Sequence, residues 1–390
     1  MTQIQIVVQF AVSGARLSEA VLQTTDSIGH LRKLVDLVLE SADPPQRSAL
    51  HTVRLLHRSQ LLEDNLLSLG SAGLSNGSMV EVVCCRSLLL ASAGEDGAAR
   101  IWNSETGESA HTLLGHDGSV LCVAFSPDGL TVATSSEDTT IKIWSVASGS
   151  LINTFKGHQH AVESVGFAPD GLTVLTASLD NTAKVWQVES GECQLTIDGH
   201  QRCVNSASFS RDGKSIVTAS DDETAKTWCA RTGACTLTLE GHTHFVLCAA
   251  FSPDSKSVAT ASRDCTAKVW SADSGDCLFT FAGHTSFVNL VAYSWDGLAI
   301  VTASDDETAK IWATESGECL LTLGDGNWNY LMAATFSPDG AAVATASFGG
   351  LVQIWSTATG DCLATLQGHR GCIHSVTFAT DGLSTSDCPM

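Results

Sequence analysis

Short runs of alternating apolar and polar residues recur through most of the chain after residue 87. A representative unit, residues 283–312, reads GHTSFVNLVAYSWDGLAIVTASDDETAKIW. Its first run spans residues 288–293, its second spans 299–304, and its third ends on Trp312. A Trp-Asp-Gly turn separates the first two runs, and a turn that carries aspartates separates the last two. Alternation of this length between Gly- and Asp-containing turns predicts short β-strands.

The unit repeats with a fixed period. Tryptophans stand at positions 102, 144, 186, 228, 270 and 312, each 42 residues after the last, and a seventh follows one residue late at 355. The histidines of Gly-His pairs recur at 116, 158, 200, 242, 284 and 369. A period of about 40–45 residues with four short strands per unit is typical of a β-propeller. The pattern predicts an all-β propeller with seven blades.

These tryptophans and Gly-His pairs resemble the WD40-repeat family over about residues 88–378. The Asp that follows the Trp in that family is absent here, because other residues occupy the position: Asn103, Ser145, Gln187, Cys229, Ser271, Ala313 and Ser356. The resemblance depends on seven spaced copies and not on any single motif.

The two ends of the repeat region each hold part of a blade. Residues 88–114 supply three strands without a first one, and residues 370–378 supply a first strand with nothing convincing after it. The economical solution joins them into one closing blade, which removes two open sheet edges. We therefore assign residues 87–390 to the propeller.

Residues 1–86 show a different pattern. Strands are predicted over 3–10, 16–23, 53–57 and 79–84, with one amphipathic helix over 28–40 that Asp43-Pro44-Pro45 terminates. This order predicts a small α+β domain. It resembles the ubiquitin-like (β-grasp) fold in the DPP after the helix, in RLLHRSQLLED (54–64) and in GLSNGSMVEVV (73–83).

The ubiquitin-like resemblance places Leu56 and Val83 on an exposed apolar patch that engages partners; the alternative is that both side chains are core. Ubiquitin ends in a Gly-Gly tail, but this chain has Cys84-Cys85-Arg86 and continues. We therefore expect a fixed module and not a protein modifier.

The WD40 resemblance also implies a buried hydrogen-bond network in each blade. It runs from the Trp through a Ser or Thr to the His, and from the His to an Asp in the tight turn, so that each buried polar group has a partner. The hydroxyl is Thr134 or Ser136 in the first set, with the same ambiguity elsewhere. The expected sets are His116, Asp138, Trp144; His158, Asp180, Trp186; His200, Asp222, Trp228; His242, Asp264, Trp270; His284, Asp306, Trp312; and, across the chain ends, His369, Asp96, Trp102.

A Ser, His and Asp together resemble a hydrolytic triad. Because the same trio recurs in blade after blade, we interpret it as structural. The unit that ends on Trp355 departs from the pattern, since Asn327 replaces the His, Gly349 replaces the Asp, and a residue is inserted near Gly324-Asp325. We expect this blade to be the least stable part of the ring. Its departures from the pattern reflect either sequence drift or a surface reshaped for a ligand.

The loops after the Gly-His pairs and the Asp-bearing turns are expected to line one mouth of the central channel. Aromatic residues with Arg in a polar ring are typical of protein-binding hot spots. The candidates at this rim are Phe245, Phe287, Tyr330, Trp328, Arg263, Phe348 and Arg202, with His160 and His244 nearby. The alternative is that Phe245, Phe287 and Tyr330 only fill gaps between blades.

The formal net charge of −21 is concentrated on the propeller. Residues 1–86 hold 7 basic and 8 acidic groups, whereas residues 87–390 hold 14 and 34. So acidic a surface disfavours direct nucleic-acid binding. No apolar stretch is long enough for membrane insertion, and the N-terminus does not read as a signal peptide. A soluble protein of the cytoplasm, the nucleus or both is expected.

The chain has 14 cysteines, and five of them share one slot in successive repeats: Cys193, Cys235, Cys277, Cys319 and Cys362. Equivalent points in neighbouring blades should lie beyond the roughly 7 Å Cα separation that a disulfide allows. No pair has zinc-ligand spacing. We expect free thiols, no metal site and no cofactor.

These patterns favour a non-enzymatic scaffold that binds proteins or peptides at the rim. Its ubiquitin-like module would recruit ubiquitin receptors, the proteasome or ligase components. The alternative is a regulatory or signalling propeller in which the ubiquitin-like fold is only a structural cap. An enzyme is not favoured, because no phosphate loop, metal spacing or unique nucleophile motif is present.

Overall fold

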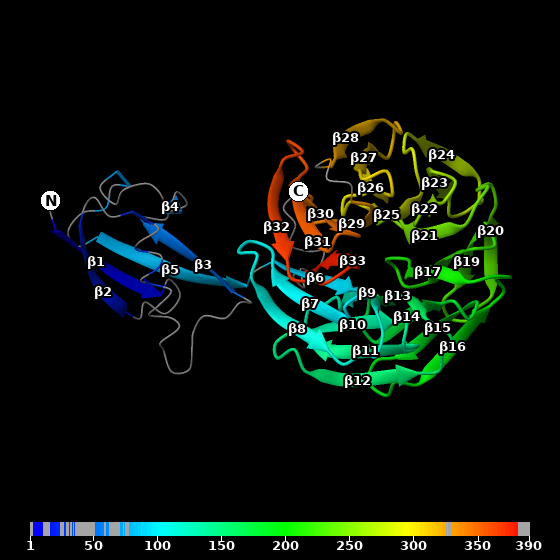
Figure 1. The fold of residues 1–390 in the computed structure, drawn as a ribbon, viewed down its shortest axis with the longest axis horizontal. Helices are drawn as coiled ribbons and strands as arrows, with labels where there is room; N and C mark the ends of the chain where they lie inside the picture. Colours follow the sequence, from blue (N-terminus) through cyan, green and yellow to red (C-terminus); the bar gives the residue numbers. More distant parts are fainter. Residues whose placement is uncertain are drawn as a thin grey trace. The chain divides into compact units, whose positions relative to one another are not determined.

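The computed structural model describes residues 88–380 except 325, 327 and 328, and, before residue 87, five strands with eight further residues. The chain divides into two compact units, Met1–Ser87 with Asn103–Ala110, and Leu88–Trp102 with His111–Met390. Figure 1 labels most of the strands of both units.

The N-terminal unit contains a five-stranded sheet in the order β2-β1-β5-β3-β4. The central pair, β1 and β5, is parallel, and the other pairs are antiparallel. The sequence predicted four strands and missed β4, because two residues are too few to show alternation. The strands are β1 (Gln3–Phe10), β2 (Arg16–Gln23), β3 (His51–His57), β4 (Gln60–Leu61) and β5 (Ser78–Arg86).

Part of the predicted amphipathic helix falls among the described residues. Ile28, Leu31 and Val35 are buried and Lys33 is exposed. The Leu31 N–H donates to the Ser27 carbonyl at 3.2 Å, as expected for the first turn of a helix. The rest of the predicted helix lies outside the described residues.

The larger unit is a propeller of seven four-stranded antiparallel sheets (Figure 1). We number the blades 1 to 7 so that blade 1 begins at β9 and blade 7 begins at β33. The first strands of blades 1 to 7 are β9 (Val120–Phe125), β13 (Val162–Phe167), β17 (Val204–Phe209), β21 (Val246–Phe251), β25 (Val288–Tyr293), β29 (Leu331–Phe336) and β33 (Ile373–Phe378).

The remaining strands follow outward in each sheet. The second strands are β10 (Thr131–Ser136), β14 (Thr173–Ser178), β18 (Ser215–Ser220), β22 (Ser257–Ser262), β26 (Ala299–Ser304), β30 (Ala342–Ser347) and β6 (Leu89–Gly94). The third are β11 (Thr140–Ser145), β15 (Thr182–Gln187), β19 (Ala225–Cys229), β23 (Thr266–Ser271), β27 (Ala309–Ala313), β31 (Leu351–Ser356) and β7 (Ala98–Asn103). The fourth are β12 (Leu151–Lys156), β16 (Cys193–Asp198), β20 (Cys235–Leu239), β24 (Cys277–Ala282), β28 (Cys319–Leu323), β32 (Cys362–Gln367) and β8 (Ser109–Leu114).

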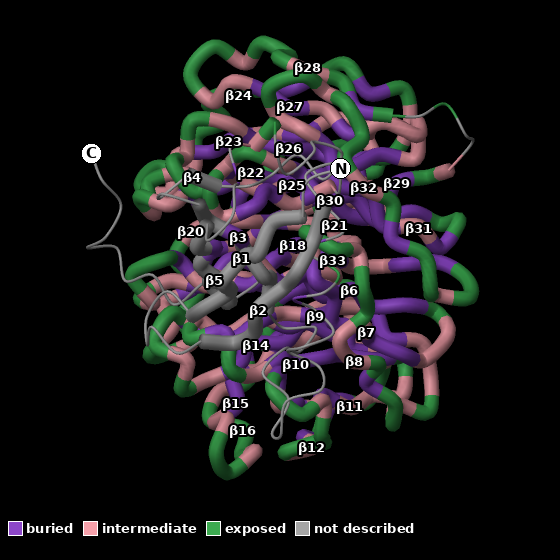
Figure 2. Tube along the Cα trace, turned by 90° about the vertical axis from the view of Figure 1, so that its left-hand side faces the viewer, coloured by how far each residue is buried: buried purple, intermediate pink, exposed green. Residues whose placement is uncertain are grey.

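The hydrophobic core lies between neighbouring blades. One cluster joins Val269 and Phe281 of blade 4 to Val291, Ile300 and Trp312 of blade 5. The Trp312 and Phe281 rings are 5.3 Å apart. Second strands are almost fully buried, whereas fourth strands bury little more than one side chain each (Figure 2). A blade therefore depends on both neighbours to cover its faces.

Blade 7 combines the two ends of the repeat region. Strand β33 pairs antiparallel with β6, with Val376 opposite Ser92 and Phe378 opposite Leu90. The first strand of each blade packs against those of its two neighbours, and β33 contacts both β29 and β9. The ring is therefore closed, and its closing sheet holds strands that are nearly 300 residues apart in sequence.

Candidate functional site

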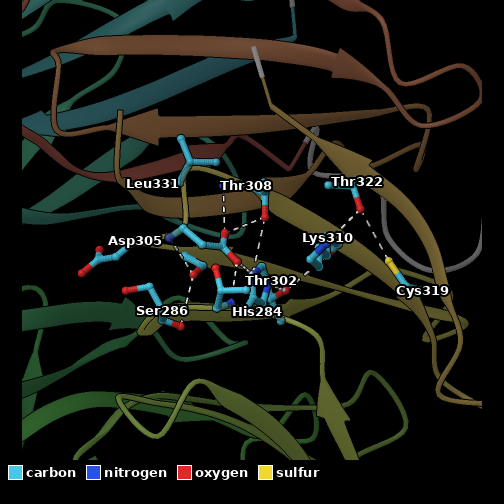
Figure 3. Close-up of polar contacts among 12 residues, drawn as sticks. His284, Ser286, Thr302, Asp305, Thr308, Lys310, Cys319, Thr322 and Leu331 are labelled. Atoms are coloured by element: carbon cyan, nitrogen blue, oxygen red, sulfur yellow. Dashed lines mark hydrogen bonds and ion pairs between the residues drawn. The ribbon is translucent and has the colours of Figure 1, made fainter. Parts of the chain in front are cut away.

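A chain of buried hydrogen bonds fixes the turns at one mouth of the propeller, and Figure 3 shows part of it in blade 5. Trp312 Nε1 donates to Thr302 Oγ1 at 2.9 Å, and Thr302 Oγ1 lies 2.7 Å from His284 Nε2. His284 Nδ1 lies 2.7 Å from Asp306 Oδ2. Asp306 also accepts the hydroxyl of Thr308 at 2.6 Å and the N–H of Thr285 at 3.0 Å. One carboxylate thus ties the loop before β25 to the turn between β26 and β27.

The same network occurs in blades 1 to 5. It contains the sets predicted for His116, His158, His200, His242 and His284. In blade 1 the hydroxyl of the network is that of Thr134. Thr134 Oγ1 accepts a hydrogen bond from Trp144 Nε1 at 2.8 Å and lies 2.8 Å from His116 Nε2. Ser136 has another role: its hydroxyl accepts the Asp138 N–H at 3.1 Å. The Thr134 hydroxyl therefore belongs to the buried network, and the Ser136 hydroxyl stabilises the turn that carries Asp138.

Blade 7 forms the network across the chain ends. Trp102 Nε1 donates to Ser92 Oγ at 2.8 Å, Ser92 Oγ lies 2.7 Å from His369 Nε2, and His369 Nδ1 lies 2.9 Å from Asp96 Oδ1. Arg100 also donates to Asp96, at 3.0 Å. The histidine after β32 is thereby bound to the turn between β6 and β7.

In blade 1 the pKa directions indicate a neutral His116 and an ionised Asp138. Burial would raise the pKa of Asp138, but hydrogen bonds from Thr140, from the Asp117 N–H and from His116 outweigh it and lower the pKa to about 2. The pKa of Asp180 is likewise lowered to about 2. Burial lowers the pKa of His116 despite the neighbouring Asp138. The Nδ1–H of a neutral imidazole then donates to the carboxylate, and Nε2 accepts from the hydroxyl.

Repetition in six blades supports a structural role for this trio. Among the described residues, no group of three or more His, Cys, Asp or Glu side chains is arranged to hold a metal ion. In the same part of the chain, no helix has the length and apolar character required to cross a bilayer.

At the same mouth, one residue from the loop before each first strand pairs with one from the turn after the second strand. The N–H of the turn residue donates to the carbonyl of the loop residue at 2.8–3.1 Å. We call these the rim pairs. In order of blades 1 to 7 they are Ser119/Glu137, Ala161/Leu179, Cys203/Asp221, Phe245/Arg263, Phe287/Asp305, Tyr330/Phe348 and Cys372/Glu95.

The rim pairs of blades 4 and 5 form an aromatic–arginine cluster. The Arg263 guanidinium carbon lies 5.5 Å from the ring centre of Phe245 and 5.5 Å from that of Phe287. The His244 ring lies 4.6 Å from Phe245 and 6.1 Å from Phe287. Arg263 is exposed, Phe287 is 38% exposed and Phe245 is half-buried. The cluster therefore joins blades 4 and 5 and also presents a surface to solvent.

Blade 6 holds a separate aromatic pair. Tyr330 and Phe348 have ring centres 6.2 Å apart and are 49% and 58% exposed. Arg202 is exposed in the loop before β17. Trp328 and Asn327 lie outside the described residues, as do the side chains of Leu56 and Val83. The predicted rim residues that are described thus lie at one mouth, and apart from Arg202 they form two ring clusters.

Blade 6 retains only the inner half of the network. Trp355 Nε1 donates to Thr345 Oγ1 at 2.9 Å, but no histidine contacts Thr345 among the described residues. A Cβ at Gly349 would overlap the side chain of Asn329. Asn329 therefore occupies the space beside the position where other blades carry the turn aspartate.

Sequence reasoning missed a link between blades at the rim. In blade 3, Asn205 Nδ2 donates to Asp221 at 2.8 Å and to the Val246 carbonyl of blade 4 at 2.9 Å. Blade 5 repeats this link, because Asn289 Nδ2 donates to Asp305 at 2.6 Å and to the Leu331 carbonyl of blade 6 at 2.9 Å. Aligning the repeats would have exposed this Asn–Asp pattern, since both residues recur 84 positions apart.

A carboxylate at the equivalent position of blade 2 was also missed. Glu163 is half-buried in β13. Burial raises its pKa to about 7, and repulsion from Glu137 and Asp221 adds to the shift. An alignment of the repeats would have shown this carboxylate, because Glu163 aligns with Asn205 and Asn289.

The repeated cysteines lie on the circumference. Cys193, Cys235, Cys277, Cys319 and Cys362 are exposed, and each begins the fourth strand of a different blade. Every cysteine in the described part of the propeller is a free thiol.

The network predicts unequal costs for the same substitution in two blades. Thr302→Val leaves Trp312 Nε1 and His284 Nε2 without a partner and should lower the free energy of unfolding by about 2–4 kcal/mol. Thr345→Val in blade 6 leaves only Trp355 Nε1 without a partner and should lower the free energy of unfolding by about 1–2 kcal/mol. Urea unfolding followed by tryptophan fluorescence measures both. Equal costs would contradict the assignment of the histidine to the network.

The pKa directions predict lower stability in acid. Burial lowers the pKa values of His116, His158, His369 and His374. Their contribution is complete above the unfolded value of about 6.5 and is lost as the pH falls through the folded values. Glu163 acts in the opposite direction, since its contribution is lost as the pH rises from about 4.5 towards 7. In a Glu163→Gln chain, where this opposing group is absent, the urea midpoint should therefore be lower at pH 5 than at pH 7.5.

In the same titration, Glu163→Gln should raise the midpoint at pH 7.5 relative to wild type and have less effect at pH 5. A midpoint that rises on acidification of the Glu163→Gln chain would contradict neutral buried histidines.

Comparison with known proteins agrees with this architecture. The family model for the WD domain, G-beta repeat, matches more than half of the chain, in six segments: residues 107–145, 149–187, 191–229, 233–271, 275–313 and 317–356. A stretch of 43 residues, about one repeat, is 51% identical to the human F-box-like/WD repeat-containing protein TBL1Y. It covers 11% of this chain and 8% of that protein. The chain belongs to the WD40-repeat family, whose propeller is a general protein-interaction scaffold.

Proposed function

We propose that the protein is a non-enzymatic scaffold whose propeller binds protein or peptide partners at the rim that carries Phe245, Phe287, Tyr330 and Phe348. The observation that carries the proposal is the clustering of rim aromatic side chains on three consecutive blades, half-buried in blade 4 and exposed in blades 5 and 6. Large aromatic residues beside an arginine supply most of the binding energy in many interfaces. In blades 4 and 5 the network ties the loops that carry Phe245 and Phe287 to the neighbouring turns, so little conformational entropy would be lost there on binding.

The second part of the proposal concerns residues 1–86. A mixed five-stranded sheet with a parallel central pair, together with buried helical positions at Ile28, Leu31 and Val35, supports a ubiquitin-like fold. On this proposal, Leu56 and Val83 form the patch that recruits ubiquitin receptors, the proteasome or ligase components. The alternative is a regulatory propeller in which this domain is only a cap.

Proximity labelling with three variants of the full chain tests both parts. Phe287→Ala/Tyr330→Ala/Phe348→Ala should remove a set of labelled proteins, because it truncates the exposed rim aromatics. Leu278→Ala/Leu320→Ala/Leu363→Ala is the matched control, since these leucines are 51%, 58% and 62% exposed on fourth strands. Leu56→Ala/Val83→Ala should remove ubiquitin-pathway proteins and leave the rim partners.

Loss of the same partners from the rim variant and its control would contradict docking at the rim. Ubiquitin-pathway proteins that are absent from the wild-type set, or that are unchanged by Leu56→Ala/Val83→Ala, would contradict recruitment and favour the cap.

A further inference from the structure

Blade 4 departs from its neighbours at two rim positions together. Blades 3 and 5 have Asn205 with Asp221 and Asn289 with Asp305, and each pair links its blade to the next. Blade 4 has Leu247 and Arg263 at the same positions. The paired change removes a hydrogen-bonded link and places a cation where both neighbours carry a carboxylate. Ring closure therefore does not require the residue at this position to be acidic.

The Arg263 side chain has no anionic partner in the described part of the chain, where no ion pair involves it. The aspartates at the equivalent positions on either side, Asp221 and Asp305, accept hydrogen bonds from asparagines of their own blades. Two phenyl rings at 5.5 Å hold the guanidinium, and the residue is exposed. Stacking restricts the side chain and leaves its edge, which carries the N–H donors, for another group.

We propose that the Phe245–Arg263–Phe287 cluster binds a peptide segment in which a Glu or Asp side chain lies next to an apolar residue. This inference rests on the proposed function of the rim and adds the chemistry of the partner. A planar guanidinium binds a carboxylate through two parallel hydrogen bonds. The apolar neighbour packs on the exposed part of Phe287.

The charge of the propeller favours a carboxylate over a phosphate. Residues 87–390 carry 34 acidic and 14 basic groups, and Asp221 and Asp305 occupy the adjacent rim positions. A phosphate carries nearly two negative charges at neutral pH and is repelled more strongly than a carboxylate. One exposed guanidinium matches one carboxylate in charge and in geometry.

The test is selection of a random 12-residue phage-displayed peptide library on the full wild-type chain, followed by affinity measurement on the selected peptides. We expect enrichment of Glu or Asp beside an aromatic or aliphatic residue. Arg263→Gln should weaken binding of such a peptide about 10–100-fold, as expected for loss of a charge-assisted pair. Arg263→Lys should recover only part of this loss, because lysine lacks the planar fork.

Matched controls make the result specific. Arg231→Gln removes an exposed arginine from the turn between β19 and β20 and should leave the affinity unchanged. A peptide with Gln in place of its Glu should bind weakly and should not distinguish wild type from Arg263→Gln. The phosphoserine version should bind no more tightly than the Glu version. Circular dichroism and the urea midpoint check that each variant is folded.

The outcomes separate this inference from the proposed function. Peptides that lose binding on Phe287→Ala but lack an acidic residue, or that ignore Arg263→Gln, would overturn the inference and leave rim docking intact. Tighter binding of the phosphoserine peptide would overturn the choice of carboxylate. If no selected peptide depends on Phe287 or Arg263, both the inference and rim docking at this cluster fail.

Discussion

Pairing of β33 with β6 is the constraint on which the rest of the propeller depends. Each blade buries its faces against its neighbours, so the cores lie in the gaps between blades. In an open ring, blade 6 would lose one covering neighbour and an unpaired sheet edge would be exposed. Ile373, Val376 and Phe378 of β33 are buried against residues of blades 6 and 7. The closing strand thus completes both a sheet and the core beside it.

Closure alone would leave the loops at the mouth free, and the polar network fixes them. The turns after the second strands require a left-handed residue, and five blades use a residue other than glycine there: Thr139, Asn181, Glu223, Cys265 and Glu307, all with φ of 68–70°. This backbone conformation is unfavourable for such residues. The turn aspartate accepts several hydrogen bonds and holds the turn in place. In the six blades that have this aspartate, rim side chains are thereby presented from fixed positions.

Most of the propeller could be predicted from the sequence, because a 42-residue period fixes the blade count and the partial units at the ends leave one way to close the ring. The network was predictable except for its hydroxyl. Thr134 and Ser136 are two residues apart and lie on the same face of β10, so alternation cannot distinguish them. The two-residue strand β4 was missed because so short a strand shows no alternation.

The candidate site was less predictable, because it depends on side chains that meet across blades. Phe245, Phe287 and Tyr330 were predicted together as rim candidates, but the described ring contacts join Phe245 and Phe287 through His244 and Arg263, and join Tyr330 to Phe348. Rotamers decide such contacts, and the repeat pattern does not specify them. The Asn–Asp links of blades 3 and 5 were readable from the alignment of repeats, whereas the position of Arg263 between two rings was not.

The account as a whole depends on a ring that the C-terminal strand closes, and removing that strand tests it most directly. Urea unfolding of a chain that ends at residue 371 should be compared with that of a chain that ends at residue 380, which keeps β33. Removing the buried side chains of Ile373, Val376 and Phe378 should by itself lower the free energy of unfolding by more than about 4 kcal/mol. The shorter chain should therefore unfold at a much lower urea concentration than the longer one. Equal midpoints for the two truncated chains would contradict a ring closed by β33 and β6.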